Sequence, residues 1–459
     1  MEKFMYEKKC GWLTCDEKQK DNIFDLSQEY ISFLNQVKTE REATKKIICE
    51  LEQNNFRNIN NISSLKAGDK IYFNNHDKSI FAAIIGDEDI KSGINVVGAH
   101  IDSPRLDLKP NPLYEDGKLA LFKTHYYGGI KKYQWTTIPL SLHGVVIKPN
   151  GEKIEIAIGE EENDPVFTIT DLLPHLAIEQ VKKPLKEGIN GESLNVLIGS
   201  IPKDEDKNAV KRKVMEILNQ TYGIEEIDFG SSELELVPAF KARHLGFDRS
   251  MIAAYGHDDR VCAYALLKAL TNINKPQKTV VGIFADKEEI GSVGNTSMQS
   301  DAFDYFINLI LDKLNQNSIS ALSTIYYHSR MLSADVGAGV DPNYQSVSEL
   351  HNSSFIGYGI ELQKYTGSSG KSGASDANAE FMAYVRNIFE KNHVTYQMSE
   401  LGKVDIGGGG TIAFILANKG MQVVDCGIPV ISMHSPFEVI SKYDLYQGYL
   451  AYKSFLETK

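Results

Sequence analysis

The sequence predicts an α/β fold whose mainly parallel sheet carries helices on both faces, with a strand-rich part inserted into it. Helical patterns alternate with short, continuous apolar runs such as TVVGIFA at 279–285, which is typical of strands buried on both faces. Residues 104–250 differ, because their apolar and polar runs alternate and are broken by Gly and Pro. The alternation of helices and strands then resumes, which indicates one domain interrupted by another.

Two amphipathic helices are expected near the start of the chain. Residues 21–37 place Ile, Leu, Tyr, Phe and Val side chains at helical spacing. A second helix is expected at about 40–53, because Thr39 and Glu42 have the spacing of a capping box.

The other elements follow from the same patterns. In the α/β part they are expected, in chain order, at 94–99 (strand), 259–270 (helix), 279–285 (strand), 377–392 (helix) and 430–433 (strand). One charged helix, at roughly 204–220, interrupts the strand-rich part. The predicted division is therefore 1–103 with 251–459 for the α/β domain and 104–250 for the insert.

Composition excludes several classes of protein. The chain has 459 residues, of which 42% are hydrophobic and 24% are charged, as is usual for globular domains. Its net charge of -12 argues against a nucleic-acid partner, because phosphate contacts need a basic face. The N-terminus lacks the apolar core of a signal peptide and no stretch approaches the roughly 18 apolar residues of a membrane span. We therefore expect a cytoplasmic protein with no membrane partner.

The cysteines agree with an intracellular location. Five cysteines are scattered along the chain without a C-x-x-C pair, which suggests neither a disulfide framework nor a zinc ribbon. They are expected to be reduced thiols.

Side chains able to bind a metal follow several apolar runs. INVVGA stops at His100, TVVGIFA at residues 286–289 and VISM at His434, while Asp335 follows a weaker apolar stretch. Asp258 and its neighbour Asp259 precede a helix. Because ligands of open α/β sheets bind beyond the carboxyl ends of strands, these groups are expected to surround a divalent cation. Such a cation would also attract the adjacent glutamates Glu288 and Glu289.

The number of candidate ligands suits two metals. Five ligands with one bridging carboxylate give each metal three protein ligands and leave open positions for a shared water, as catalytic zinc sites require. One glutamate of the pair can then bind metal while the other holds a proton of that water. Taken singly, the histidines could be hydrogen-bonded core residues, Asp335 a cap and the glutamate pair a solvated turn. Their shared position at strand ends favours the metal site.

Five motifs, taken in order, resemble the M18 family of metalloaminopeptidases, the aspartyl aminopeptidase and aminopeptidase I group. They are GAHIDSPRLDLKPNP, GHDDR, DKEEIGS, SADVGAGVDPNY and MHSP. Two further stretches, KYTGSSGKSGASDANAE and KVDIGGGGTIA, are closer to the aminopeptidase I branch. The resemblance covers nearly the whole chain. It implies a dizinc exopeptidase-like catalytic domain at 1–103 and 251–459, with a dimerisation domain inserted at 104–250.

The resemblance also implies the roles of individual residues. It implies two zinc ions per subunit, for which cobalt or manganese can substitute, held by His100, Asp258, Glu289, Asp335 and His434. Glu288 is then the general base, and Asp102 steadies the first histidine. By the resemblance Asp258 is the bridging ligand and Asp259 stands where many relatives have Asn, whereas on chemistry alone either aspartate could bridge.

The implied activity is hydrolysis of the first peptide bond of peptides with neutral or acidic N-terminal residues. Family members assemble through the insert, so a homo-oligomer is expected, a dodecamer built from dimers. In LLPHLAI, His175 matches a histidine that reaches the substrate of a neighbouring subunit, although Glu179 stands where relatives often have a second His. A core or capping role for His175 stays open. Lys371 is the candidate cation for substrate binding, with a solvated loop lysine as the alternative.

Rival interpretations are weaker. GSSGKSG is not a phosphate loop, because the motif would need Gly where Tyr365 stands. The run GGGG at 407–410 is either a flexible turn or a place where backbone approaches the substrate. A non-catalytic, metal-stabilised assembly protein would not need a free base beside its ligands. The M42 peptidases share the D-D-R and adjacent-Glu features, but the long insert after the first His motif favours M18.

Overall fold

The computed structural model describes residues 4–367 and 369–459, which form two compact units. The α/β unit comprises the chain up to Asp102, Ala242–Met433 and Phe437–Lys459. The inserted unit comprises Ser103–Lys241 and His434–Pro436. The chain returns to the α/β unit at Ala242 and not at the expected residue 251, because Arg243–Leu245 pairs as a strand with Met251–Ala254.

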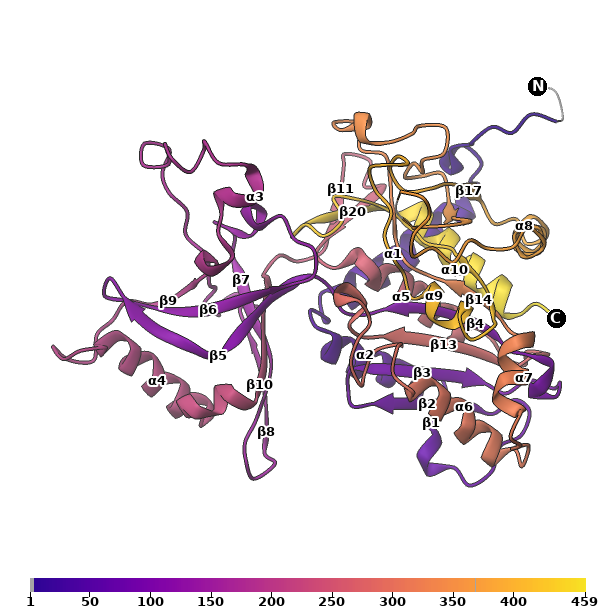
Figure 1. The fold of residues 1–459 in the computed structure, drawn as a ribbon, viewed down its shortest axis with the longest axis horizontal. Helices are drawn as coiled ribbons and strands as arrows, with labels where there is room; N and C mark the ends of the chain where they lie inside the picture. The colour runs from indigo at the N-terminus through magenta and orange to yellow at the C-terminus, as the bar shows by residue number, and fades with distance from the viewer. Residues whose placement is uncertain (1–3, 368) are drawn as a thin grey trace. The chain divides into compact units, whose positions relative to one another are not determined.

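A seven-stranded sheet forms the centre of the α/β unit (Figure 1). Its order is β1 (Arg57–Asn58), β2 (Lys70–Asn75), β3 (Ser79–Ile84), β13 (Val280–Ala285), β4 (Asn95–His100), β14 (Arg330–Ser333) and β18 (Gln422–Asp425). Four of the six neighbouring pairs are parallel, whereas β3 runs antiparallel to both β2 and β13. The predicted α/β class with a mainly parallel sheet is confirmed.

Helices cover both faces of this sheet. One face packs against α1 (Glu17–Leu34), α2 (Glu40–Gln53), α5 (His257–Thr271), α8 (Ala379–Lys391) and α10 (Lys442–Leu456). The other packs against α6 (Ala302–Lys313), α7 (Ala321–His328) and α9 (Ala413–Ala417). The central strand β4 alternates between the two cores, because Val97 and Ala99 lie in the first and Val96 in the second. Burial on both sides explains why its sequence is continuously apolar.

Local capping signals set the N-terminal helices. Helix α2 spans the predicted residues, and both bonds of its capping box form: Thr39 Oγ1 accepts from Glu42 N at 3.3 Å, and Glu42 Oε2 accepts from Thr39 N at 3.1 Å. Helix α1 begins four residues before the expected start, because Asp16 and Gln19 form a second capping box.

A second, five-stranded sheet belongs to the same unit. Its order is β11 (Arg243–Leu245), β12 (Met251–Ala254), β20 (Glu438–Ser441), β19 (Pro429–Ile431) and β15 (Gly337–Ala338). The strand expected at 430–433 is therefore wrong in its sheet: β19 lies here and pairs antiparallel with β20, not in the seven-stranded sheet. Strands β16 (Ile360–Leu362) and β17 (Tyr396–Met398) form a separate parallel pair.

The inserted unit is built on a six-stranded antiparallel sheet. Its order is β8 (Lys153–Ile158), β7 (Leu140–Ile147), β10 (Ser232–Pro238), β5 (Arg105–Asp116), β6 (Leu119–Tyr127) and β9 (Val196–Gly199). The unit also has helices α3 (Leu185–Gly188) and α4 (Ala209–Tyr222). Helix α4 starts at Ala209, later than the expected residue 204. At this start, Glu115 Oε2 accepts hydrogen bonds from Val210 N and Lys211 N at 2.9 and 3.0 Å.

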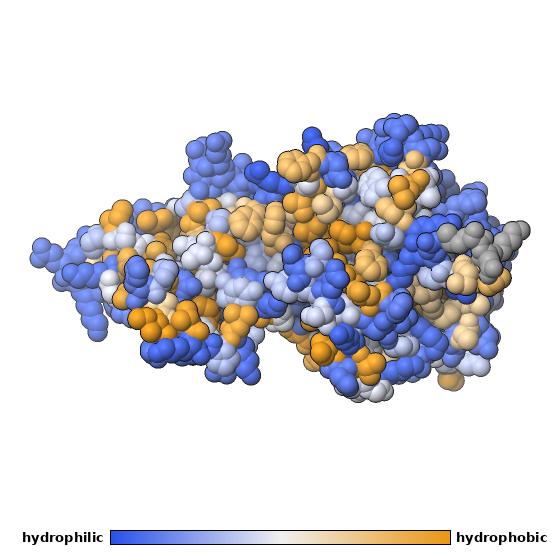
Figure 2. All heavy atoms as spheres, turned by 90° about the horizontal axis from the view of Figure 1, so that it is seen from above, coloured by the Kyte–Doolittle hydropathy of each residue, from blue (hydrophilic) through white to orange (hydrophobic). Residues whose placement is uncertain are grey.

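Hydrophobic and hydrophilic residues are interspersed on the face drawn in Figure 2. In the inserted unit, the loop before and into α3 carries side chains that are each at least half exposed: Leu172, Leu173, Leu176, Ile178, Val181 and Leu185. Among the described residues, no helix has the length and apolar character needed to cross a membrane.

Candidate metal centre

The strands of the central sheet bring polar residues to one edge. Strand β4 ends at His100, which is in register with Ala285 at the end of β13. On its other side β4 is parallel to β14, which ends two residues before Asp335. Because the carboxyl ends of parallel strands meet at the same edge, the residues that follow these strands gather there.

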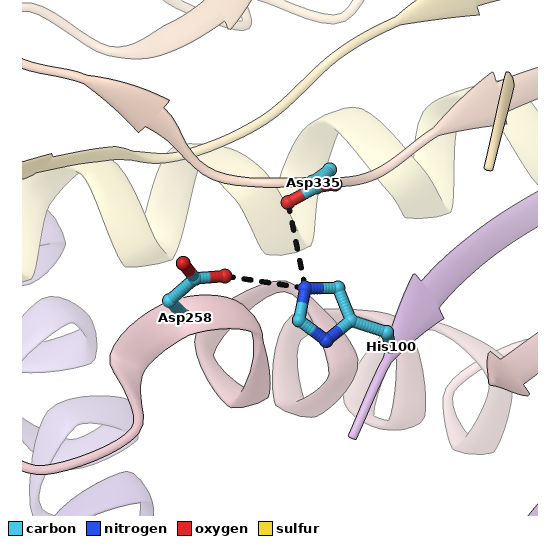
Figure 3. Close-up of side chains that lie close together, drawn as sticks. All are labelled: His100, Asp258 and Asp335. Carbon is cyan, nitrogen blue, oxygen red and sulfur yellow. Dashed lines mark ion pairs between the residues drawn. The ribbon is translucent and has the colours of Figure 1, made fainter. Parts of the chain in front are cut away.

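His100 lies among carboxylates (Figure 3). Its Nε2 is 3.2 Å from Asp258 Oδ1 and 3.6 Å from Asp335 Oδ1, and Figure 3 shows both carboxylates directed at this nitrogen. Glu288 Oε2 lies 3.9 Å from the same atom. His100 is 2% exposed and Asp258 3%. These four sequence-predicted residues therefore meet at one position, where His100 and Asp258 are buried and Asp335 and Glu288 are partly exposed.

The other ring nitrogen fixes the orientation of His100. Its Nδ1 lies 3.0 Å from the backbone oxygen of Asp102 and 3.3 Å from its Oδ1. Both atoms only accept hydrogen bonds, so Nδ1 carries the hydrogen and Nε2 presents a lone pair to the carboxylates. That arrangement is repulsive unless a proton or a metal cation lies between them.

The pKa of His100 depends on two opposing effects, burial of the ring and hydrogen bonds to the carboxylates. Burial alone would lower the pKa, but hydrogen bonds to Asp102, Asp258 and Asp335 outweigh it and raise the pKa well above its usual value. Imidazole nitrogen and carboxylate oxygen are ligands that zinc prefers. His100, Asp258 and Asp335 each offer one such atom, and these atoms all lie within 4.8 Å of one another. The donor set and its surplus of negative charge fit a divalent cation.

Asp102 has a second function that the sequence did not reveal. Its Oδ1 accepts from Glu288 N at 3.2 Å and its Oδ2 from Glu289 N at 3.3 Å. These amides open the short 3-10 helix Glu288–Ile290. One buried carboxylate thus orients the histidine and fixes the backbone of both glutamates.

Hydrogen bonds of Lys287 fix the segment that precedes the two glutamates. Lys287 has a left-handed backbone (φ 65°), and its Nζ donates to Asp286 Oδ2 at 2.9 Å and to Thr296 Oγ1 at 2.8 Å. Asp286, which the sequence grouped with the metal-capable residues, thus accepts a hydrogen bond from this lysine.

The pKa of Glu288 is raised to about 8, first by burial and then by the carboxylate of Asp335.

The two aspartates at the start of α5 point in different directions. Asp258 faces His100 Nε2, and its own N donates to Glu438 Oε2 at 3.1 Å. Asp259 is fully buried, and its Oδ2 accepts from the backbone N of His100 at 3.2 Å. Glu438 is a further residue of the site that sequence reasoning missed, because no motif connects it to a segment 180 positions earlier.

Asp335 is positioned by a glycine. A Cβ atom on Gly427 would lie 1.6 Å from the backbone oxygen of Asp335, a distance that only glycine permits. The neighbouring Cys426 N donates to Ser333 O at 2.8 Å, which continues the pairing of β14 and β18 toward the site.

Three further sequence-predicted residues lie on other segments of the chain. His434 belongs to the segment His434–Pro436 of the inserted unit, where its Nδ1 is 2.8 Å from Gly129 O. His175 is exposed in a turn of the inserted unit. Lys371 is also exposed, and its Nζ lies 3.4 Å from Asp376 Oδ2 and 3.9 Å from the centre of the Tyr365 ring.

Comparison with known proteins identifies the family. The sequence profile of the family described as "Aminopeptidase I zinc metalloprotease (M18)" matches residues 33–456. The chain belongs to the M18 family. It is an aminopeptidase of a zinc metalloprotease family, as the five motifs predicted.

Relatives of the M18 family match over nearly their whole length. The probable M18 family aminopeptidase 1 of Clostridium acetobutylicum is 50% identical over 456 residues, which cover 98% of each chain. The crystal structure of the M18 aminopeptidase from Thermotoga maritima superposes with a TM-score of 0.96 at 46% identity and covers 99% of this chain and 100% of its own. The predicted likeness to the aminopeptidase I branch is confirmed.

A more distant solved structure shows the fold alone. The mApe1 dodecamer of S. cerevisiae has a TM-score of 0.76 at 20% identity and covers 95% of this chain and 97% of its own.

Proposed function

We propose that this M18 protein is a dinuclear zinc aminopeptidase that hydrolyses the N-terminal residue from peptides. The observation that carries the proposal is the lone pair of buried His100 Nε2, which faces the carboxylates of Asp258, Asp335 and Glu288 within 3.9 Å. So many acidic groups around one imidazole require compensating positive charge.

The residues that would hold the metals divide into two groups. His100 and Asp335 would bind one ion and Asp258 would bridge to the second, which the burial and the distances within the α/β unit support. Glu289 and His434 complete the second site on the strength of their motifs. When bound, the two ions supply Lewis-acid polarisation of the scissile carbonyl and activation of a water molecule.

The side chains around the metals move the proton and keep the geometry. Glu288 takes a proton from the attacking water and returns it to the leaving amine, the exchange expected of a general base with a raised pKa. Asp102 keeps the hydrogen of His100 on Nδ1 and fixes the backbone of Glu288. The surrounding carboxylates favour a free, positively charged N-terminus, which explains exopeptidase action.

Metal removal tests this proposal. Dialysis against a chelator is expected to abolish release of the N-terminal residue from a leucyl peptide, and zinc, cobalt or manganese to restore it. The same peptide with an acetylated N-terminus is the matched control and should not be cleaved. Metal analysis should find two ions per chain, which leave more readily at low pH because the ligands must be deprotonated. Full activity of metal-free protein would contradict the proposal.

Neutral N-terminal residues are proposed to be cleaved at least as well as acidic ones. An acidic side chain would need a cationic partner in its pocket, because a buried carboxylate without one costs several kcal/mol. Lys371 was the candidate, but it is engaged by Asp376 and Tyr365. The same assay therefore compares kcat/KM for leucyl, aspartyl and glutamyl substrates in wild type and Lys371→Met. A strong preference for aspartate that collapses in the variant would make Lys371 the specificity residue.

We also propose a homo-oligomer built from dimers, with the dodecamer as the expected state. The exposed apolar side chains from Leu172 to Leu185 support an interface, because six such side chains within one short segment would lose contact with water there. His175 lies within that exposed loop, as a role toward a neighbouring subunit would require. Light scattering that shows a fully active monomer would refute assembly. His175→Phe with intact assembly and unchanged kinetics would refute only the contribution to a neighbour's site.

A further inference from the structure

A basic pocket lies in the α/β unit at the edge of the five-stranded sheet, among residues that the aminopeptidase site does not use. The cavity has a volume of about 470 Å³ and is lined by Ile31, Ala242, Arg243, His244 and Arg249. A volume of this size is in the range of small-molecule sites, roughly 300–1,000 Å³. Ile31 comes from α1, and Ala242 directly precedes β11. Arg243 and His244 belong to β11, and Arg249 lies in the loop that follows it.

The strand register places a buried lysine on the same face as this pocket. His244 pairs with Ile252 of β12, and Ile252 pairs with Ile440 of β20. Directly paired residues, and residues two apart along a strand, project from the same face. Lys442 is two positions beyond Ile440 and is the first residue of α10. The backbone of Ser441 is still extended (φ -85°, ψ 136°), and Lys442 N donates to Ser250 O at 3.0 Å, so the pairing of β20 with β12 continues to this residue. Its Nζ lies 4.1 Å from the centre of the Phe24 ring of α1. His244 and Lys442 therefore both face α1.

Two nitrogens on this face are buried without a hydrogen bond. Within the described part of the chain, neither His244 Nδ1 nor Lys442 Nζ has a hydrogen-bond partner, and Lys442 is fully buried. The acidic group that acts on Lys442 is Asp248, whose Oδ1 already accepts from Ser250 N and Ser250 Oγ at 3.1 and 2.9 Å. Positive charge at this face is thus poorly compensated.

The cations around the pocket disfavour one another. Burial, followed by the charge of Arg249, lowers the pKa of Lys442 to about 8. Burial also lowers the pKa of His244, with Lys442 and Arg249 adding to the effect. On a chain with a net charge of -12, two arginines, a lysine and a histidine gathered in this way form a local positive field.

We propose that the basic pocket binds a small phosphate monoester. Its phosphate group would lie between Arg243, Arg249 and His244, because guanidinium groups match phosphate oxygens through two parallel hydrogen bonds. Its organic part would lie against Ile31 and Ala242. Lys442 would not need to touch the ligand, since its buried charge is compensated by an anion placed in the pocket beside it.

Phenyl phosphate is the probe, used with the full-length, zinc-loaded protein. Titration calorimetry and the rise in Tm with ligand concentration measure binding, because a ligand that binds the folded state stabilises it by mass action. Arg249→Met is expected to weaken binding at least about 10-fold through loss of charge-assisted hydrogen bonds. Arg57→Met, which removes an exposed arginine far along the sequence, is the matched control and should bind as wild type.

Lys442→Met gives a second test that does not depend on Arg249. Methionine fills a similar volume without a buried charge, so the variant should have a higher Tm than wild type without ligand and a smaller rise with phenyl phosphate. Inorganic phosphate and benzoate separate the sources of affinity: phosphate should compete, and benzoate should compete far more weakly. The proposal is overturned if wild type binds no phosphate compound at millimolar concentration or if Arg249→Met binds as well as Arg57→Met. It is also overturned if Arg249→Met instead dissociates an oligomer, which would make the pocket a subunit contact.

Discussion

Glu288→Gln is expected to keep its metal content and to lose roughly 10²-fold or more in kcat, the scale typical of a general base. The amide has the size of the carboxylate but cannot accept the proton of the attacking water. Glu288 is suited to this role because burial and Asp335 raise its pKa to about 8 in the protein alone, and bound cations bring that pKa toward neutrality. Since only the carboxylate form accepts a proton, kcat/KM should fall as the pH drops through this pKa.

Glu289→Gln is the matched control, because it makes the same change one residue away. The backbone N atoms of both glutamates donate to Asp102, so neither substitution removes the anchor of the segment. If Glu289 is a ligand, its variant should lose metal occupancy at low zinc concentration and recover activity when zinc is added. Metal content per chain and kcat for a leucyl substrate distinguish the two variants. Near-normal turnover of Glu288→Gln, with lost turnover of metal-saturated Glu289→Gln, would show that the roles are reversed.

Elements with strong local signals could be predicted closely from the sequence. The Thr39 and Glu42 capping box gave α2 its observed start, and the apolar runs at β4 and β13 were located within one residue. Burial on both faces makes such strands continuously apolar, so their pattern does not depend on distant partners. The sheet that contains the strand expected at 430–433 was not predicted correctly, because it does depend on a distant partner. The antiparallel strand β20 decides which sheet this strand joins, and the apolar run does not specify that partner.

The antiparallel pairing of β2 with β3 in the central sheet was not predicted, although it has a local signal. Strands β2 and β3 form a hairpin around residues 76 and 77, both with left-handed backbone. The Asn74 side chain donates to Asp77 Oδ1 at 2.7 Å, which stabilises the turn. Asn and Asp clusters between apolar runs are typical of such turns, so the stretch NNHDKS could have indicated the hairpin.

The candidate site was predictable in its residue types but not in its second layer of contacts. Metal-capable side chains at strand ends can be read from the sequence, because the sheet brings those ends together. The hydrogen bonds from Glu288 N and Glu289 N to Asp102, and from Asp258 N to Glu438, join segments about 180 positions apart. Such contacts depend on how backbone amides are oriented, and a single sequence contains no periodic signal for that orientation.

Which of the adjacent aspartates Asp258 and Asp259 faces the proposed metal site could be decided only from the directions of their side chains. This difference predicts a large effect for one of the two substitutions. Asp258→Asn is expected to lose both metals and with them all measurable activity. Because Asp258 is the proposed bridging ligand, its substitution should reduce metal affinity by more than the roughly 10- to 100-fold loss typical for a residue that only hydrogen-bonds to a ligand. Its carboxylate is 3.2 Å from His100 Nε2, the atom with the free lone pair.

Asp259→Asn should behave differently, although it lies one residue away and is equally buried. Its Oδ2 accepts from His100 N, a bond that the amide oxygen of Asn can keep. Burial, then the charge of Asp335, raise the pKa of Asp259 well above its usual value, so a neutral side chain suits this position. We therefore expect near-normal metal content and activity, measured by metal analysis and by kcat/KM for a leucyl substrate. If Asp259→Asn lost the metals while Asp258→Asn kept them, Asp259 would be the bridging ligand and the direction of the two side chains would have to exchange when metal binds.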